Sequence, residues 1–229
     1  MLNIDLPTDG SRRTAHELVR DTLRQAILRG TLPGGLRLVQ AEIATQLEVS
    51  TTPVREALRD LATEGLIRLD AHRGAIVREL EFSEVEEIYD LRMLLEPEAL
   101  RRATANITAE ELAYAASLQA QMDEETDAGV WADLNREFHA TLVKAARAPR
   151  LITILQNLRD SAAPYVGLSL QTSEEQRRHA NVHHRGILEA MRTGDADTAA
   201  AVALEHLEST RQILAERGPA LAQEEVTTA

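Results

Sequence analysis

The sequence predicts a mainly α protein built from two parts. Ala, Leu, Glu, Arg and Gln, which favour helices, dominate the chain. Its 229 residues, of which 44% are apolar, are enough for one or two domains with a buried core. Charge distinguishes the two parts. Residues 1–80 carry 11 Arg against 11 acidic residues, so residues 81–229 carry the entire net charge of −12. We therefore expect one domain over residues 1–80 and a second over residues 81–229.

Composition excludes several classes of protein. No stretch approaches the roughly 18 consecutive apolar residues of a membrane-spanning helix. Residues 1–10 lack the basic head and the apolar run of a secretory signal. The chain has no Cys, which excludes disulfides and thiolate chemistry and is typical of a reducing compartment. The sequence therefore predicts a cytoplasmic protein without a membrane partner.

The first part has the pattern of three helices followed by a hairpin. Gly30 ends the first apolar stripe of helical spacing, and Ser50 or Thr51 caps the third helix. Residues 71–74 are a turn signal between two short apolar runs. The expected elements are helices at residues 11–29, 41–47 and 51–64 and strands at residues 66–69 and 75–80. This order is typical of a winged helix-turn-helix, in which the third helix enters the major groove of DNA and the hairpin is the wing.

The second part is expected to be an antiparallel helical bundle. Its capping boxes are Ser83 with Glu86, Thr108 with Glu111, and Ser173 with Gln176. The helices are expected at residues 83–104, 108–127, 130–147, 150–168, 173–193 and 195–216. Pro97 should kink or divide the first of them, because proline lacks the N–H group that a hydrogen bond inside a helix needs. Residues 218–229 are expected to form a loose tail.

Four short segments of the first part form a specific pattern. They are residues 30–34 (GTLPG), 47–58 (LEVSTTPVREAL), 64–67 (EGLI) and 73–77 (RGAIV). Together they resemble the DNA-binding domain of the GntR family of bacterial transcription regulators. The remainder resembles the all-helical ligand-sensing (FCD) domain of the FadR-type subfamily. The residues on which this resemblance rests are Asn135, Phe138, His139, His184 and His206. The resemblance implies a homodimer whose two recognition helices read a palindromic operator in double-stranded DNA.

The DNA contacts that we expect lie on the third helix and at the tip of the wing. They are Ser50, Thr51, Thr52, Arg55, Arg59, Arg73 and Gly74. Thr51 stands where the family usually has an Arg, and Ala41 stands where the preceding helix often has a basic residue. Arg55 and Arg59 share one helical face and remain to contact phosphates or base edges. The alternative is that both arginines only pair with acidic residues of their own helix. These residues are Glu56, Asp60 and Glu64.

Polar residues interrupt the apolar stripes of three helices in the second part. Asn135 and His139 lie four residues apart on one inward face, and His184 and His206 each lie on the inward stripe of a later helix. Three imidazoles and one amide oxygen are a plausible ligand set for a divalent transition metal. The alternative is that each histidine is a core residue that is hydrogen-bonded to a neighbouring helix.

The spacing of these four residues matches the resemblance. Metal-containing FadR-type domains have an Asp or Asn, a His four residues later and two further His residues 22 positions apart, which is the separation of His184 and His206. Because Asn135 is neutral where Asp is common, zinc or nickel is favoured over magnesium or calcium. His179 and His183 form a rival pair with the same spacing of four, but their face carries small and polar residues, so we expect them outside the site.

Arg92 is the unexpected residue on the inward stripe of the first bundle helix. A buried Arg needs an acidic partner, which is either Glu96 one turn later or the carboxylate of a ligand. The family's effectors are often small organic acids bound against the metal, and this resemblance favours the ligand. Tyr89 is a further candidate for the effector cavity, with core packing as the alternative.

Two other functions compete with an effector-responsive regulator. Three His residues around zinc with an open position can also activate water in a hydrolase. Glu137 and Glu189 are the acids nearest to the site by spacing, and both point away from the inward stripes, so the sequence predicts no enzyme. In the other alternative the metal is purely structural and DNA binding is constitutive. The leading hypothesis is a regulator in which a small organic acid shifts the population between states of different DNA affinity.

Overall fold

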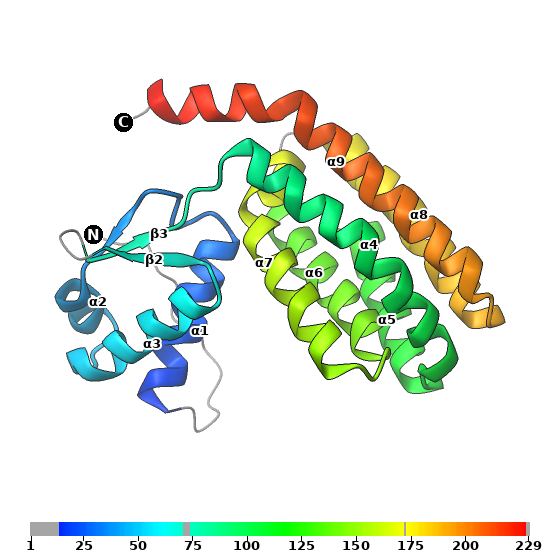
Figure 1. Ribbon diagram of the computed structural model, residues 1–229, viewed down its shortest axis with the longest axis horizontal. Coiled ribbons are helices and arrows are strands. Elements are labelled where there is room, and N and C mark those ends of the chain that lie inside the picture. Colours follow the sequence, from blue (N-terminus) through cyan, green and yellow to red (C-terminus); the bar gives the residue numbers. More distant parts are fainter. Residues whose placement is uncertain (1–13, 71–73, 172, 228–229) are drawn as a thin grey trace. The chain divides into compact units, whose positions relative to one another are not determined.

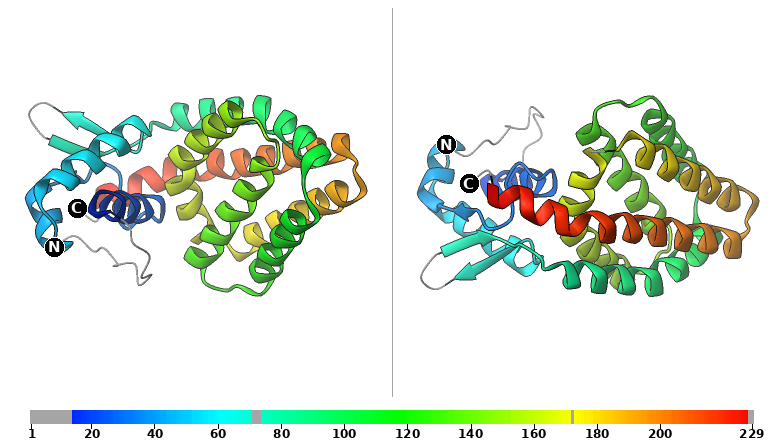
Figure 2. Two further views of the ribbon diagram at one scale, coloured as in Figure 1. Left: turned by 90° about the horizontal axis from the view of Figure 1, so that it is seen from below. Right: turned by 90° about the horizontal axis from the view of Figure 1, so that it is seen from above.

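The structure is a computed structural model that describes residues 14–70, 74–171 and 173–227 (Figure 1). The chain divides into two compact units, which meet in sequence at Leu80 and Glu81. Figure 2 shows the helices of both units from two further directions. None of the described helices is long and apolar enough to cross a membrane.

The described part of the first unit consists of helices packed beside a small sheet. Its elements are α1 (Ala15–Leu28), β1 (Arg37–Leu38), α2 (Gln40–Gln46), α3 (Thr51–Thr63), β2 (Ile67–Asp70) and β3 (Gly74–Val77). The strands form an antiparallel sheet in the order β1-β3-β2. Leu23 and Ile27 of α1 and Leu58 and Leu61 of α3 are buried where the two helices pack together. This contact holds α3 at the surface with its opposite face exposed.

Two features of this unit differ from the sequence prediction. Helix α1, predicted from residue 11, begins at Ala15 with Thr14 as its cap. Thr14 and Glu17 form a complete capping box: the Thr14 hydroxyl accepts from the Glu17 N–H at 3.2 Å, and the Glu17 carboxylate accepts from the Thr14 N–H at 2.9 Å. Strand β1 was not predicted. With two residues it has no alternation to detect, and its pairing partner Ile76 lies far along the chain.

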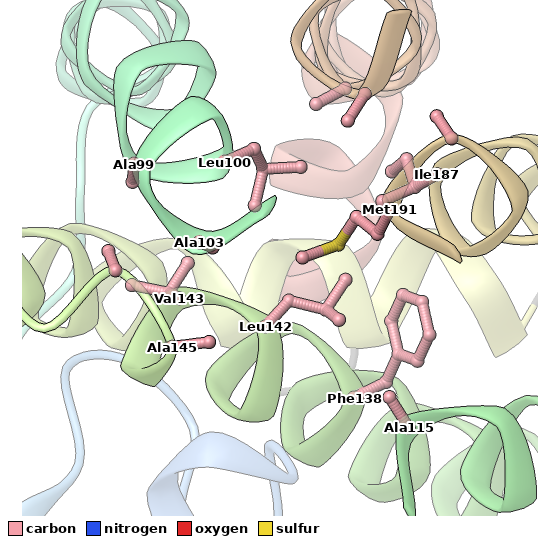
Figure 3. Close-up of a cluster of buried hydrophobic side chains, with 14 of the residues drawn as sticks. Ala99, Leu100, Ala103, Ala115, Phe138, Leu142, Val143, Ala145, Ile187 and Met191 are labelled. Carbon is pink, nitrogen blue, oxygen red and sulfur yellow. The ribbon is translucent and has the colours of Figure 1, made fainter. Parts of the chain in front are cut away.

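The second unit is a bundle of long helices. They are α4 (Phe82–Asn106), α5 (Ala109–Glu124), α6 (Ala128–Lys144), α7 (Pro149–Gln171), α8 (Glu174–Thr193) and α9 (Ala196–Thr227). Helix α9 lies beside both α4 and α8, and α6 packs between α5 and α7 (Figures 1 and 2). The core between these helices is apolar: Leu100 of α4, Phe138 and Leu142 of α6 and Ile187 and Met191 of α8 meet there (Figure 3).

The helix ends of the bundle confirm some of the capping predictions and correct others. The capping box of Thr108 and Glu111 is formed, and Ser173 caps α8 by accepting from the Gln176 N–H at 3.2 Å. Helix α4 begins at Phe82, before the predicted cap Ser83, because the Glu84 carboxylate accepts from the N–H of Glu81 at 2.9 Å.

Helix α4 is not divided at Pro97, which was one of the two outcomes predicted for that proline, and α9 does not end before Gly218. Helix α4 continues through Pro97 as one helix, since residues on both sides of the proline, such as Glu96 and Ala99, are buried against neighbouring helices. Helix α9 continues to Thr227, whereas the sequence predicted a loose tail from Gly218. Ala, Leu, Gln and Glu follow Gly218 and Pro219, and these residues favour continuation of the helix.

Candidate functional site

The bundle brings together His139 of α6, His184 of α8 and His206 of α9. All three side chains are buried. Their imidazole ring centroids lie 4.9 Å apart for His139 and His184, 5.2 Å for His139 and His206 and 4.9 Å for His184 and His206. One ring nitrogen of each residue lies within 4.8 Å of one ring nitrogen of each of the others. Three separate helices therefore supply a compact group of potential nitrogen ligands.

A hydrogen-bonded chain orients His184. The Gln119 amide nitrogen donates to Asp123 Oδ1 at 2.9 Å, and Arg185 donates to the same oxygen at 2.6 Å. The Gln119 Oε1 atom therefore faces His184, where it lies 3.0 Å from Nδ1. Because an amide oxygen can only accept, His184 Nδ1 carries the proton and Nε2 keeps its lone pair. That Nε2 atom is buried and has no hydrogen-bond partner among the described residues.

Asn135 adds a second buried acceptor without a partner. It lies one turn before His139 on α6, and its Oδ1 atom makes no hydrogen bond with the described residues. Buried polar atoms are normally hydrogen-bonded, and those that are not need an explanation. An imidazole nitrogen and an amide oxygen are both ligand atoms that a divalent transition metal accepts.

Burial keeps the three histidines neutral. It lowers the pKa of His139 and of His184 well below 6.5, and nearby cations add to the effect. For His206, burial and the neighbouring His183 and Arg92 lower the pKa to about 3. At neutral pH all three rings are therefore free of the second proton, which is the form that coordinates a metal.

A buried charged triad lies next to the histidines. Arg92 Nε donates to Glu96 Oε1 at 2.7 Å, and Arg159 of α7 donates to both oxygens of Glu96, at 3.0 and 2.5 Å. Burial alone would raise the pKa of Glu96, but Arg159 and Arg92 outweigh it and lower that pKa to about 2. Two guanidinium groups thus share one carboxylate, and the triad carries a net charge of +1.

The triad shows that Glu96 is an acidic partner of Arg92, as one of the two sequence interpretations expected. The internal pair with Glu96 is formed, and the Arg92 guanidinium lies 4.7 Å from the ring centroid of the buried Tyr89.

Arg159 was missed by the sequence analysis, although it lies four residues after the buried Leu155 and could have been found as a polar residue on an apolar stripe. Its Nη1 atom is buried and has no hydrogen-bond partner among the described residues.

The candidate DNA contacts on α3 are on its exposed face. Ser50 is the residue that precedes the helix, but its side chain makes no capping hydrogen bond. Thr51, Thr52, Arg55 and Arg59 are exposed with it. Gly74 is exposed at the start of β3, where its φ of +79° favours glycine. Arg73 lies outside the described residues.

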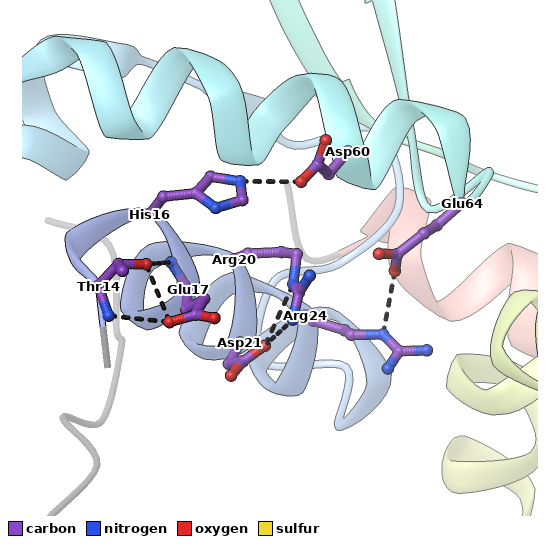
Figure 4. Close-up of polar contacts among 8 residues, drawn as sticks. All are labelled: Thr14, His16, Glu17, Arg20, Asp21, Arg24, Asp60 and Glu64. Atoms are coloured by element: carbon purple, nitrogen blue, oxygen red, sulfur yellow. Dashed lines mark hydrogen bonds and ion pairs between the residues drawn. The ribbon is translucent and has the colours of Figure 1, made fainter. Parts of the chain in front are cut away.

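The acidic neighbours of the two arginines are held by helix α1. His16 Nε2 lies 2.8 Å from Asp60 Oδ2, and Arg24 Nε lies 3.1 Å from Glu64 Oε2 (Figure 4). Among the described residues, no ion pair involves Arg55 or Arg59. The structure therefore does not show Arg55 or Arg59 in ion pairs with acidic residues of their own helix, which was the alternative interpretation of these arginines. His16 is a half-buried partner of α3.

Both units match known protein families. Residues 15–77 match the family described as bacterial regulatory proteins, gntR family, and residues 87–209 match the FCD domain. The probable D-xylose utilization operon transcriptional repressor of Paenarthrobacter nicotinovorans is 33% identical over 199 residues, which cover 86% of this chain and 87% of the relative. The Nta operon transcriptional regulator of Aminobacter aminovorans is 31% identical over 176 residues, which cover 76% of this chain and 82% of the relative.

A solved structure shows the same fold. It is that of E. coli McbR/YncC, which superposes with a TM-score of 0.79 at 24% identity and covers 90% of this chain and 99% of its own. The family and the two relatives are transcription regulators and not enzymes, as the sequence predicted. The chain belongs to the GntR family of bacterial regulatory proteins, with an FCD domain after its winged helix-turn-helix, and is a DNA-binding transcription regulator.

Proposed function

We propose that the second unit of this regulator senses a small organic acid at a metal site, and that binding of the acid changes the affinity of the first unit for a palindromic operator. The observation that carries the proposal is the set of buried, unpartnered polar atoms gathered around the histidines. They are Asn135 Oδ1, His184 Nε2 and Arg159 Nη1. Two of these atoms suit a cation and the third suits an anion, which is the combination that a metal with a bound carboxylate satisfies.

The metal ligands in this proposal are Asn135, His139, His184 and His206. A neutral, nitrogen-rich ligand set suits zinc or nickel better than magnesium or calcium, which prefer carboxylate and water oxygens. When bound, the metal supplies a positive charge and open coordination positions for a carboxylate. The chain itself contributes the orientation of the ligands, since the Gln119 contact presents the lone pair of His184.

The anion side of the site consists of Arg159 and Arg92. Glu96 neutralises only one of the two guanidinium charges, so an acid that enters next to the triad completes the balance of charge. A guanidinium group binds a carboxylate through two parallel N–H groups, and Arg159 has a buried nitrogen to spare. The Tyr89 ring lies against the Arg92 guanidinium, and its role in this proposal is to hold that guanidinium in place.

The operator contacts in this proposal come from α3 and the wing. They are Ser50, Thr51, Thr52, Arg55, Arg59, Arg73 and Gly74. A homodimer places two such helices about one turn of DNA apart, so it reads a palindrome. The first unit is neutral while the second carries the excess acid, and this distribution keeps the repulsive charge out of the unit that binds phosphates.

The two activities are connected through α4. Arg92 and Glu96 lie on this helix, and it begins at Phe82, a few residues after β3 ends at Val77. Helix α4 follows directly after the wing in the sequence. If the acid binds the triad more tightly in one state of the bundle than in another, its binding favours that state of α4. This is a coupling free energy between two sites, and it acts equally in both directions.

Elemental analysis, followed by thermal-shift titration with small carboxylates, tests the proposal. The parent should carry about one metal ion per chain, because each chain supplies one complete set of the proposed ligands. The double variant His139→Ala, His184→Ala should carry none, and Val182→Ala is the control because its side chain is exposed on the same helix as His184. A carboxylate should raise the Tm of the parent and of the control but not that of the double variant. Metal-free parent protein would sink the proposal, whereas metal without any response to acids would favour a structural metal.

A further inference from the structure

Two histidines outside the proposed ligand set continue it toward the surface. His179 and His183 lie one turn apart on α8, and their ring centroids are 4.6 Å apart. The His183 ring centroid in turn lies 5.8 Å from that of His206 on α9. Imidazole groups thus follow one another at short intervals from His179 to the inner histidines.

Exposure falls along this series. His179 is exposed, His183 is half-buried and His206 is buried. The Nδ1 atom of His183 is buried and has no hydrogen-bond partner among the described residues. Two imidazoles one turn apart on a helix can hold a transition metal between them, and a metal satisfies a buried ring nitrogen that has no other partner.

The charge around the pair favours a cation. The carboxylate of Glu205, on α9, is close enough to act electrostatically on His183. The second unit as a whole also carries the excess of acidic residues, which attracts cations from solution to its surface. By contrast, the inner histidines lie beside the positive triad of Arg92, Glu96 and Arg159, which repels an arriving metal ion.

We propose that His179 and His183 form an outer docking site that captures a transition metal ion and passes it to the inner histidines. The proposal rests on the metal site proposed above. Two ligands bind an ion more weakly than four, so an ion held by the pair exchanges readily, and its closeness gives it a high effective concentration at the inner site. Because the pair is not part of the final site, it changes the rates of loading and release and leaves the affinity of the inner site unchanged.

Trp131 provides a built-in signal for the test. It is the only tryptophan of the chain, and its ring stacks on His184 with a centroid distance of 6.1 Å. Binding of Ni²⁺ at the inner histidines should therefore quench its fluorescence. Apoprotein is mixed with Ni²⁺ in a stopped-flow instrument to obtain the loading rate, and equilibrium titration of the same samples gives the affinity.

The variants compared are His179→Gln and the double variant His179→Gln, His183→Gln. Val182→Gln is the matched control, since Val182 is exposed on the same helix and receives the same new side chain. Removal of the pair should lower the second-order loading rate about tenfold, as expected when a ligand loses a docking site with high effective concentration. The affinity should change by less than about twofold. The control should load at the parent rate.

The outcomes separate this proposal from the one on which it rests. Equal loading rates for the parent and His179→Gln overturn the docking site and leave the inner metal site standing. An affinity that falls by the same factor as the rate would place the pair in the final site, and this also overturns it. A parent that takes up no Ni²⁺ contradicts the proposed function itself, and the docking site fails with it.

Discussion

The Nδ1 atom of His184 lies 3.0 Å from the Oε1 atom of Gln119, and this contact sets the tautomer of the most deeply buried histidine. The orientation of the Gln119 amide is itself set by its donation to Asp123. A neutral residue on α5 thereby controls which nitrogen of α8 is available as a ligand. Groups of this kind, one contact removed from a metal, tune both the geometry and the strength of binding.

Replacement of Gln119 by Ala should weaken metal binding without removing a ligand. Loss of the acceptor frees the His184 ring to rotate and to change tautomer, and loss of such a partner commonly lowers metal affinity by about 10- to 100-fold. Competition with a coloured chelator measures the change. Gln121→Ala is the control, because this exposed residue of the same helix donates only to the Ser117 carbonyl. Equal affinities for the two variants would contradict the role given to Gln119.

Asn135→Asp should bind metal more tightly than the parent. The substitution keeps the shape of the side chain and adds a negative charge next to the proposed ion, whereas Asn135→Leu removes the oxygen. We expect a gain in affinity of about tenfold for the Asp variant and a loss of similar size for the Leu variant, within the range that carboxylate ligands provide. Isothermal titration of the apoprotein with Zn²⁺ measures both. If the order of the two variants is reversed, Asn135 is not a ligand.

Glu96→Gln should destabilise the second unit strongly. The variant leaves two guanidinium groups buried without a carboxylate, and a broken buried ion pair costs about 3–5 kcal/mol. Urea unfolding followed by circular dichroism measures the free energy of unfolding. Glu98→Gln on the same helix is the control, because Glu98 pairs with Arg102 at the surface, where the expected effect is below about 1 kcal/mol.

The cost of losing Glu96 should shrink in acid. The folded protein holds the pKa of Glu96 at about 2, below the value of 4.5 for an unpaired carboxyl group. The ionised carboxylate therefore contributes its full stabilisation above about pH 4.5, and this contribution is lost as the pH falls toward 2. The difference in unfolding free energy between parent and Glu96→Gln should accordingly narrow between pH 5 and pH 3. A difference that stays constant over this range would mean that the charge on Glu96 is unimportant.

Arg55→Gln and Arg59→Gln should each weaken operator binding by about tenfold, which is the usual effect of losing one base or phosphate contact. Both arginines are exposed, and helix α1 holds the acids beside them. Fluorescence anisotropy with a labelled operator at two salt concentrations measures the loss and shows whether the contact is to phosphate. Arg192→Gln is the control, since Arg192 pairs with Glu189 in the other unit. Binding equal to that of the control would place both arginines outside the DNA interface.

Much of the local structure of this protein follows from its sequence. The capping box of Thr108, the inward positions of His139, His184 and His206 and the exposed face of Arg55 all follow from spacing within one helix. Such patterns are readable because helix formation and amphipathicity depend on residues a few positions apart. Local pattern does not decide whether a proline divides a helix: α4 continues past Pro97, with Glu96 and Ala99 on either side of it buried against neighbouring helices. Gly218 does not end α9, since residues that favour helices follow it.

Packing between helices determines which of these residues come into contact. Arg159 joins Glu96 across 63 residues, and His184 meets Gln119 across 65 residues. Asp60 could have paired along its own helix, but it is held by His16 of α1. Sequence spacing alone does not distinguish among several possible partners for one side chain. The partner is selected by which helices pack against each other, and burial of the whole core determines this packing. Residue spacing within single helices is enough to predict the fold class and the candidate ligands, while packing between helices sets the hydrogen bonds and charges that orient those ligands.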